Sequence, residues 1–378
     1  MTDHMSAVLG FLGGYILPYI LILSLLVFIH EMGHYLAGRL SGIRVLAFSV
    51  GFGPELVGFT DRHGTRWKIS AIPLGGYVRF FGDADAASMP DGKAIEDLSD
   101  AEKAQTLNGA KLWKRAITVA SGPIANFVLA IVIFAVMFGT MGKPVSDPVV
   151  ADLKQGSAAE TAGIERGDVL VALDGHAIET FDDVVRYITM RPEVPVTVTV
   201  RRAGQEIDFP IVPKRAVTTD RFGNSMEVGQ IGIITDQKAG NFRIVELSPL
   251  QAVWEGVRQT GHIVTGTFDY IGNMIAGRMN ADQLGGPVRV VQASGEMATL
   301  GVIALLNLAA VLSVSLGLLN LMPVPVLDGG HLVLYAIEAV RGRPMGQGAQ
   351  EVAFRIGLAM ILSLMVFATW NDISRLIG

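Results

Sequence analysis

Residues 15–40 read YILPYILILSLLVFIHEMGHYLAGRL, and the string His30-Glu-Met-Gly-His34 lies inside this apolar run. A helix places side chains four residues apart on one face, so both imidazoles can reach one metal ion and Glu31 can act on its water. The H-E-x-x-H pattern is typical of hydrolytic zinc sites. Because ionisable groups at membrane depth are rare and usually functional, the stretch predicts a hydrolytic metal site inside a bilayer.

The composition indicates a membrane protein with a water-soluble part. Half of the 378 residues are hydrophobic and 17% are charged, below the roughly 25% usual for soluble domains. The net charge of −5 gives no reason to expect nucleic acid as a partner. The chain has no cysteine, which excludes disulfides and thiol catalysis and leaves His, Asp and Glu as zinc ligands.

Four apolar stretches are each near the roughly 20 residues that a membrane-spanning helix needs. They cover about 15–40, 116–142, 301–327 and 352–370. Cytoplasmic loops carry the excess of Lys and Arg, so the basic segment 39–115 is expected inside and the N-terminus outside. The orientation then alternates, with 143–300 outside, 328–351 inside and the C-terminus outside.

Residues 41–82, between the first two spans, are rich in Gly and alternate apolar with polar positions. The strings Trp67-Lys-Ile-Ser-Ala-Ile72 and Tyr77-Val-Arg-Phe-Phe81 flank Pro73-Leu-Gly-Gly76. This pattern predicts a β-hairpin with its turn at 73–76. We expect either a small cytoplasmic sheet or a hairpin that dips back toward the metal site, where irregular backbone is allowed if it lines a cavity.

Residues 147–213 are predicted to form an independent domain. The expected elements are strands at 149–153, 167–175 and 194–200, a short helix within 156–164 and a helix over 182–189. Their order, with the string Ser157-Ala-Ala-Glu-Thr-Ala-Gly-Ile164, resembles a PDZ domain. Such domains bind peptide termini by adding a strand to a sheet edge. Residues 214–300 are expected to be a linker with a long helix over 251–279 at the membrane surface.

A catalytic zinc site needs three protein ligands and an open position. The other acids and histidines near membrane depth are Asp328, His331, Glu338 and Asp372. His30 lies about 22 Å along the first span, past the midplane. The third span ends at Asp328 at a similar depth, and two prolines before it unwind the helix and aim Asp328 inward. Asp328 is therefore the expected third ligand, with His331 open as a substitute.

The H-E-x-x-H of the first span, the N-x-x-P-x-P-x-L-D-G string from Asn320 to Gly329, and the PDZ-like domain between them resemble the site-2 protease family of intramembrane zinc metalloproteases. The chain is most similar to the bacterial regulator-of-sigma-E protease branch. The strings Gly122-Pro-Ile-Ala-Asn126 and Gly75-Gly-Tyr-Val-Arg-Phe80 are also similar to that branch. The better-known members carry two tandem PDZ domains, whereas one is found here.

This resemblance implies one Zn²⁺ ion held by His30, His34 and Asp328, with Glu31 as the catalytic acid/base. It also implies that the substrate is held in extended form by Asn320 and the hairpin residues Gly75, Gly76, Tyr77 and Val78. The expected fold is a mainly α membrane protein of about four transmembrane helices, with a membrane-associated β-hairpin and one periplasmic PDZ-like domain.

The implied catalytic halves are residues 1–142 and 301–378, in the inner membrane of a bacterium. The implied substrates are single-span membrane proteins, such as anti-sigma factors after a first cleavage, or remnant signal peptides.

Two other classes of protein stay open. A membrane-anchored PDZ scaffold would bind the termini of exported proteins without catalysis, and a metal transporter would use the His/Asp cluster to carry zinc. The matched depth of His30 and Asp328 favours the enzyme. Asn126, in the second span, is expected only to join helices by hydrogen bonding.

Overall fold

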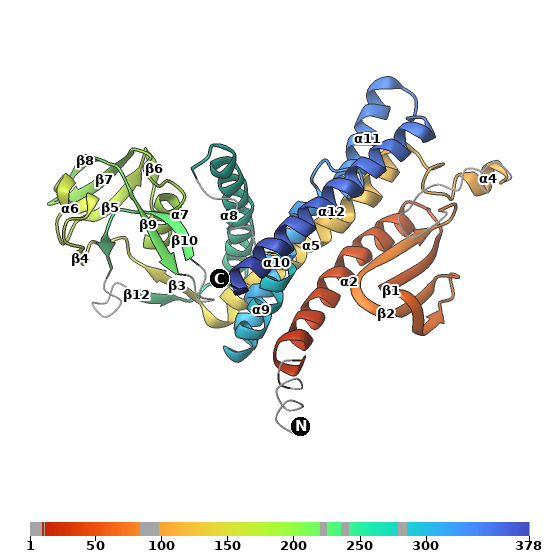
Figure 1. The fold of residues 1–378 in the computed structure, drawn as a ribbon, viewed down its shortest axis with the longest axis horizontal. Helices are drawn as coiled ribbons and strands as arrows, with labels where there is room; N and C mark the ends of the chain where they lie inside the picture. Colours follow the sequence, from red (N-terminus) through yellow and green to blue (C-terminus); the bar gives the residue numbers. More distant parts are fainter. Residues whose placement is uncertain are drawn as a thin grey trace. The chain divides into compact units, whose positions relative to one another are not determined.

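The computed structural model describes residues 10, 12–83, 98–219, 225–235, 242–278 and 286–377. The chain divides into two compact units, one of residues 1–134 with 285–378 and one of residues 135–284. The first unit is built mainly of long helices, and the second combines short strands with helices (Figure 1).

Long apolar helices dominate the first unit. They are α2 (Leu17–Leu40), which follows the π-helical turn η1 (Leu12–Ile16), and α5 (Leu112–Met141), α10 (Val302–Asn320) and α12 (Gln347–Ile377). Among the described residues, four stretches are long and apolar enough to cross a membrane: Leu12–Leu40, Leu112–Met141, Val302–Asn320 and Gly348–Ser374. They coincide with the predicted spans, except that the third helix ends at Asn320 rather than at 327.

α2 and α5 approach each other closely because small residues face each other at their contact. A β-carbon added to Gly33 would collide with the carbonyl of Ser121 and would lie 2.9 Å from Cβ of Ala125. Small residues allow helix backbones to pack at such short range inside a membrane. Gly33 lies between His30 and His34, so the close approach occurs at the predicted metal site.

β1 (Val45–Thr60) and β2 (Arg66–Phe80) form one sheet that packs against α2 (Figure 1). The predicted hairpin with its turn at 73–76 is wrong in its strand pairing, although the chain does reverse direction there. Its two arms do not pair with each other: residues 76–80 pair with 45–50, and residues 66–69 pair with 57–60 and with 47–50. Residues 66–69 run parallel to 47–50 and residues 76–80 run antiparallel to them, so β2 does turn back between its two arms, with Gly75 at a φ of 122°, and residues 45–50 lie between the arms.

Asp61 fixes the turn between β1 and β2. Its carboxylate accepts hydrogen bonds from the backbone N–H of His63 at 2.8 Å and of Thr65 at 2.9 Å, and from the Trp67 indole at 3.0 Å. Partial burial acts to raise the pKa of Asp61, but these hydrogen bonds outweigh it and lower the pKa to about 2. Tyr35 of α2 donates to the same carboxylate, so the turn is tied to the first span.

One carboxylate connects α9 (Pro287–Thr299) to the end of α12. Asp372 is 7% exposed and accepts hydrogen bonds from the backbone N–H of Gly286 at 2.9 Å, Val288 at 3.1 Å and Arg289 at 3.2 Å. The first N–H groups of a helix have no acceptor within that helix. Asp372 therefore supplies a cap from a distant part of the chain.

We expect Asp372→Ala to lower the free energy of unfolding by about 1 to 3 kcal/mol, because the capped N–H groups lose their acceptor. Denaturant unfolding in detergent micelles measures the change. Asp372→Asn keeps one carbonyl oxygen as an acceptor and is expected to lose less. Glu351→Ala, at an exposed acid on the same helix, is the control. An equal loss in that variant would contradict the capping role.

The second unit contains a four-stranded sheet in the order β6-β5-β7-β8. Its strands are β5 (Val169–Leu173), β6 (His176–Ala177), β7 (Val196–Arg202) and β8 (Gln205–Ile211), and its helices are α6 (Ala158–Ala162), α7 (Phe181–Thr189) and α8 (Pro249–Ile275). Three further pairs are β4 (Asp152–Leu153) with β11 (Ile233–Ile234), β9 (Lys214–Thr219) with β10 (Ser225–Gln230), and β3 (Lys143–Ser146) with β12 (Phe242–Val245).

The core of this unit extends past the predicted domain end at 213. Ile231 is buried together with Val150 and Leu170, and Ile233 lies opposite Leu153 in the β4–β11 pair. The predicted end at 213 falls too early because the apolar segment that contains Ile231 and Ile233 is short. β9 and β10 separate this segment from the other strands of the core. The predicted helix over 251–279 is α8, which ends at Ile275, and position 279 lies outside the described residues.

Candidate metal centre

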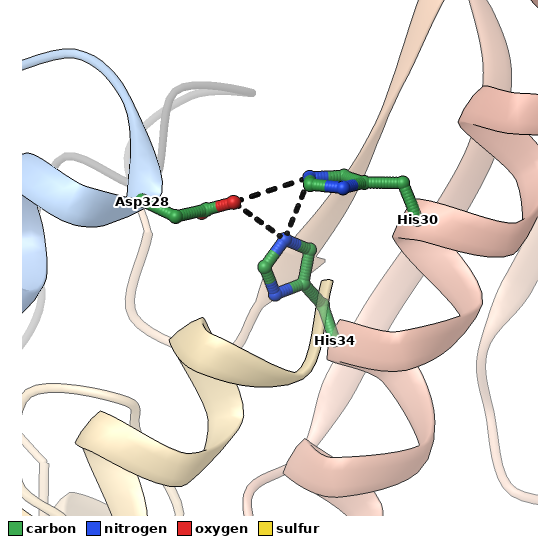
Figure 2. Close-up of side chains that lie close together, drawn as sticks. All are labelled: His30, His34 and Asp328. Atoms are coloured by element: carbon green, nitrogen blue, oxygen red, sulfur yellow. Dashed lines mark hydrogen bonds and ion pairs between the residues drawn. The ribbon is translucent and has the colours of Figure 1, made fainter. Parts of the chain in front are cut away.

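His30, His34 and Asp328 point toward one another from α2 and from the start of α11 (Asp328–Arg341) (Figure 2). The Nε2 atoms of the two histidines are 3.2 Å apart. Oδ2 of Asp328 lies 3.2 Å from Nε2 of His30 and 3.4 Å from Nε2 of His34. Both histidines are buried. The three side chains form a group that can hold a metal ion.

This donor set fits zinc. Zinc bonds of roughly 2.0–2.2 Å to His nitrogen and carboxylate oxygen place adjacent tetrahedral ligands about 3.3 Å apart. The three observed separations are 3.2, 3.2 and 3.4 Å. Oδ2 of Asp328 is buried and makes no well-directed hydrogen bond within the described chain, as expected of an atom whose natural partner is a cation. Three protein ligands leave a fourth position for water or substrate.

α5 holds the second nitrogen of each imidazole. Nδ1 of His34 donates to the backbone carbonyl of Thr118 at 2.9 Å. A carbonyl only accepts, so the proton of His34 sits on Nδ1 and its Nε2 keeps a free lone pair. Nδ1 of His30 lies 3.1 Å from the amide of the fully buried Asn126. The role of Thr118 could not be predicted, because a backbone acceptor does not depend on residue type.

Gly122 of α5 leaves the space that the imidazoles fill. A β-carbon added there would collide with Nε2 of His34 and would lie 2.9 Å from Cε1 of His30. Glycine in a helix interior costs roughly 0.5–1 kcal/mol relative to Ala. A glycine inside an otherwise apolar helix, despite this cost, was the one signal in the sequence that could have indicated the close contact between α5 and the two imidazoles.

We expect Gly122→Ala to weaken zinc binding at least about 10-fold, because the new methyl group displaces both imidazoles from the shared point. Zinc affinity of the purified protein is measured by competition with a chelator. Gly139→Ala is the matched control on the same helix, since a β-carbon there meets only an ordinary 3.5 Å contact with Ala252. Unchanged zinc affinity in Gly122→Ala would contradict the tight packing described here.

Asp328 reaches the cluster because the third span stops short of it. α10 ends at Asn320, residues 321–327 form turns that contain two prolines, and α11 begins at Asp328 itself. A β-carbon on Gly330 would collide with the carbonyl of Val324. The predicted break at the prolines is present, and the two glycines after Asp328 allow the chain to turn tightly into α11.

A cavity of about 200 Å³ opens beside the donor atoms. Its lining includes His30, Glu31, His34, Asp328, His331, Asn320, Gly76, Tyr77 and Val78. The cavity therefore brings together all but one of the residues predicted to contact substrate. The exception is Gly75, where an added β-carbon would press on the ring of Phe52 within the sheet.

Glu31 lies in the wall of this cavity, on the same helix as the two histidines. It is 9% exposed and shares the cavity lining with Val78 of β2. A β-carbon on Gly76 would lie 3.4 Å from Cγ of Glu31 and 2.6 Å from the carbonyl oxygen of Ser49. β2 can pass this close to Glu31 because position 76 has no side chain.

The remaining candidates from the sequence do not join the donor group. His331 lines the cavity but is not a member of that group. Glu338 forms an ion pair with Arg115 of α5 at 2.9 Å. Asp372 caps α9, as described above. Within the described chain, Asp328 is thus the third side chain at the point where the two histidines meet.

Comparison with known proteins identifies the family. The model of peptidase family M50 matches residues 18–364. A zinc metalloprotease of Agrobacterium fabrum is 70% identical over the full length of both chains. A zinc metalloprotease of Rhizobium meliloti is 62% identical, covering 96% of this chain and 98% of the relative. The metalloprotease MmpA of Caulobacter vibrioides is 35% identical, covering 94% of each.

These matches span both membrane halves and the unit between them, and they favour the enzyme over the scaffold and the transporter. The family model covers the H-E-x-x-H string and Asp328 alike. The chain belongs to peptidase family M50, the site-2 proteases, and is a zinc metalloprotease with several apolar helices of membrane-spanning length.

Proposed function

We propose that this protein cleaves peptide bonds within or near the transmembrane segments of single-span membrane proteins. His30, His34 and Asp328 would hold the zinc ion, and Glu31 would be the catalytic acid/base. The observation that carries the proposal is the shared cavity. It joins the three donor atoms, Glu31 and one edge of β2, and its histidines lie on a helix long and apolar enough to span a membrane.

In the proposed reaction, the carboxylate of Glu31 takes a proton from the water that attacks the peptide carbonyl. It then gives a proton to the amide nitrogen of the departing segment, so that one carboxylate serves both steps. Zinc, when bound by the three ligands, supplies the acidification of water and the polarisation of the carbonyl. The close packing of β2 against Glu31 limits the directions from which water and substrate can reach the carboxylate.

The substrate is proposed to bind in extended form, because a helix hides the carbonyl that must be attacked. Residues 76–80 pair with β1 along one edge, and Gly76 and Val78 line the cavity from the other side. An unwound segment can add to that edge as a further strand. Asn320 donates to the carbonyl of Leu316 through its amide nitrogen, which leaves its oxygen available to the cavity.

We further propose that the protein resides in the inner membrane of a bacterium with residues 143–300 in the periplasm. Its role there would be regulated proteolysis, acting on anti-sigma factors after a first cleavage or on remnant signal peptides. The bias of Lys and Arg toward 39–115 supports this orientation. A substrate that has already lost its periplasmic part would enter a site enclosed by membrane-spanning helices more easily than an intact one.

A second proposed partner is a peptide terminus at the PDZ-like part of residues 135–284. A cavity of about 520 Å³ is lined by α7, through Phe181, Val184 and Ile188, by residues 231–233, and by 216–218 of β9 and 228–230 of β10. β11 pairs with β4 along one edge, and no strand of the described chain pairs with its other edge. A peptide can add to that open edge with apolar side chains directed toward α7.

The test of the catalytic proposal is cleavage of a single-span reporter in liposomes that contain the purified protein. We expect products cut within the transmembrane segment, loss of cleavage with 1,10-phenanthroline and recovery on addition of zinc. A reporter with a helix-stabilising, leucine-rich segment should be cut more slowly, since it resists unwinding. Cleavage confined to soluble loops, or cleavage that resists the chelator, would refute the proposal.

A further inference from the structure

The contact between Asn126 and His30 is the least explained feature of the metal centre. Asn126 is fully buried, and its Nδ2 lies 3.1 Å from Nδ1 of His30. Its Oδ1 is buried and has no hydrogen-bond partner among the described groups. A buried amide oxygen without a partner costs about 1 to 3 kcal/mol, so the orientation of this amide needs a reason.

The two amide orientations assign different protons to His30. With Nδ2 toward the imidazole, Nδ1 must accept, and the imidazole proton moves to Nε2, the atom that faces Asp328 at 3.2 Å. With Oδ1 toward the imidazole, Nδ1 donates and Nε2 keeps its lone pair. Oxygen and nitrogen of an amide occupy equivalent positions, so the hydrogen-bond network decides between them. The second orientation gives Oδ1 a partner and places Nδ2 where no partner lies among the described groups, so the two orientations differ in the lone pair that Nε2 keeps toward Asp328.

We propose that Asn126 is a positioning residue for the zinc ligand His30, with Oδ1 accepting the proton of Nδ1. The proposal rests on the proposed role of His30 as a ligand. Asn126 then does for His30 what the Thr118 carbonyl does for His34, and both supports come from α5. Metal-binding imidazoles commonly donate their other N–H to such an oxygen, which fixes the ring and its tautomer.

Asn126 is itself held firmly, as a positioning residue requires. Its backbone carbonyl accepts a hydrogen bond from Oγ of Ser313 on α10 at 2.8 Å. A β-carbon on Gly317 of the same helix would lie 3.4 Å from Cβ of Asn126, so α10 packs directly against this residue. The amide therefore sits between the helix that carries His30 and the helix that leads to Asp328, with little freedom to move away.

The experiment measures zinc affinity of the full-length protein in detergent, by chelator competition, for four variants. Asn126→Ala removes the acceptor and is expected to weaken zinc binding about 10- to 100-fold. Asn126→Asp restores an oxygen acceptor and is expected to bind zinc within a few-fold of wild type. Asn307→Ala, an exposed asparagine on α10, is the control and should bind zinc normally. His30→Ala tests the ligand assignment and should lose zinc.

Thermal unfolding shows whether each variant is folded. Wild-type zinc affinity in Asn126→Ala, with zinc lost in His30→Ala, would overturn the inference and leave the ligand assignment intact. Zinc retained in His30→Ala would instead overturn the ligand assignment. If Asn126→Ala does not fold, Asn126→Asp carries the test. A folded Asp variant that loses zinc would show that the amide N–H groups matter, and would also overturn the inference.

Discussion

Glu31→Gln is expected to abolish peptide-bond cleavage while the protein still binds one zinc ion. A positioned general acid/base contributes about 10²- to 10⁴-fold to the rate, and glutamine cannot take up the proton. The substitution preserves side-chain size, so packing against Gly76 can persist. None of the three donor atoms is changed. The measurement pairs reporter cleavage in liposomes with metal analysis of the same preparation.

Glu351→Gln provides the control, because Glu351 is an exposed acid on α12 and lies outside the cavity. It should retain both cleavage and zinc. Cleavage retained by Glu31→Gln would remove Glu31 from the mechanism, whichever residues bind the metal. Loss of zinc together with cleavage would instead show that Glu31 supports the metal centre, and its assignment as acid/base would have to be abandoned.

The spans and the metal cluster could be predicted because their signals are local or follow from membrane depth. An apolar run of sufficient length specifies a spanning helix from composition alone. Two histidines four residues apart are brought to one face by helix geometry. Asp328 is distant in sequence, but the bilayer restricts each span to one axis, so counting residues placed it level with His30.

The contribution of α5 could not be predicted in the same way. Thr118 acts through its backbone, and Gly122 acts by lacking a side chain, so neither carries chemistry that a motif would reveal. Asn126 was expected only to join helices. Its contact with His30 depends on the rotation of α5 about its axis, which is set by packing between spans. A single sequence contains no direct record of that rotation.

The sheet of β1 and β2 illustrates a second limit. Alternating apolar and polar residues identified extended segments, but alternation does not specify which segments pair. Turn residues at 73–76 do accompany a reversal, but the two arms beside it pair with residues of β1 and not with each other. The reversal at 61–65 depends on hydrogen bonds to Asp61 from the backbone of His63 within the turn and from the indole of Trp67 after it. Those bonds became apparent only in three dimensions.

Asp328→Ala is expected to remove both zinc binding and cleavage. Its effect on zinc affinity should exceed the loss of about 10- to 100-fold that is typical when a residue supporting a ligand is removed. Oδ2 of Asp328 lies within 3.4 Å of both Nε2 atoms, and two imidazoles alone leave the site one ligand short. Metal analysis after dialysis against a weak chelator, together with reporter cleavage, measures both losses.

His331→Ala separates this expectation from the alternative that the sequence left open. His331 lines the same cavity but lies outside the donor group, so its alanine variant should keep zinc while Asp328→Ala loses it. The reverse result would make His331 the third ligand. For His331 to reach the two histidines, α11 would have to shift. The close contact of Gly330 with the Val324 carbonyl leaves little room for such a shift. The pair of variants therefore tests the ligand and the local backbone together.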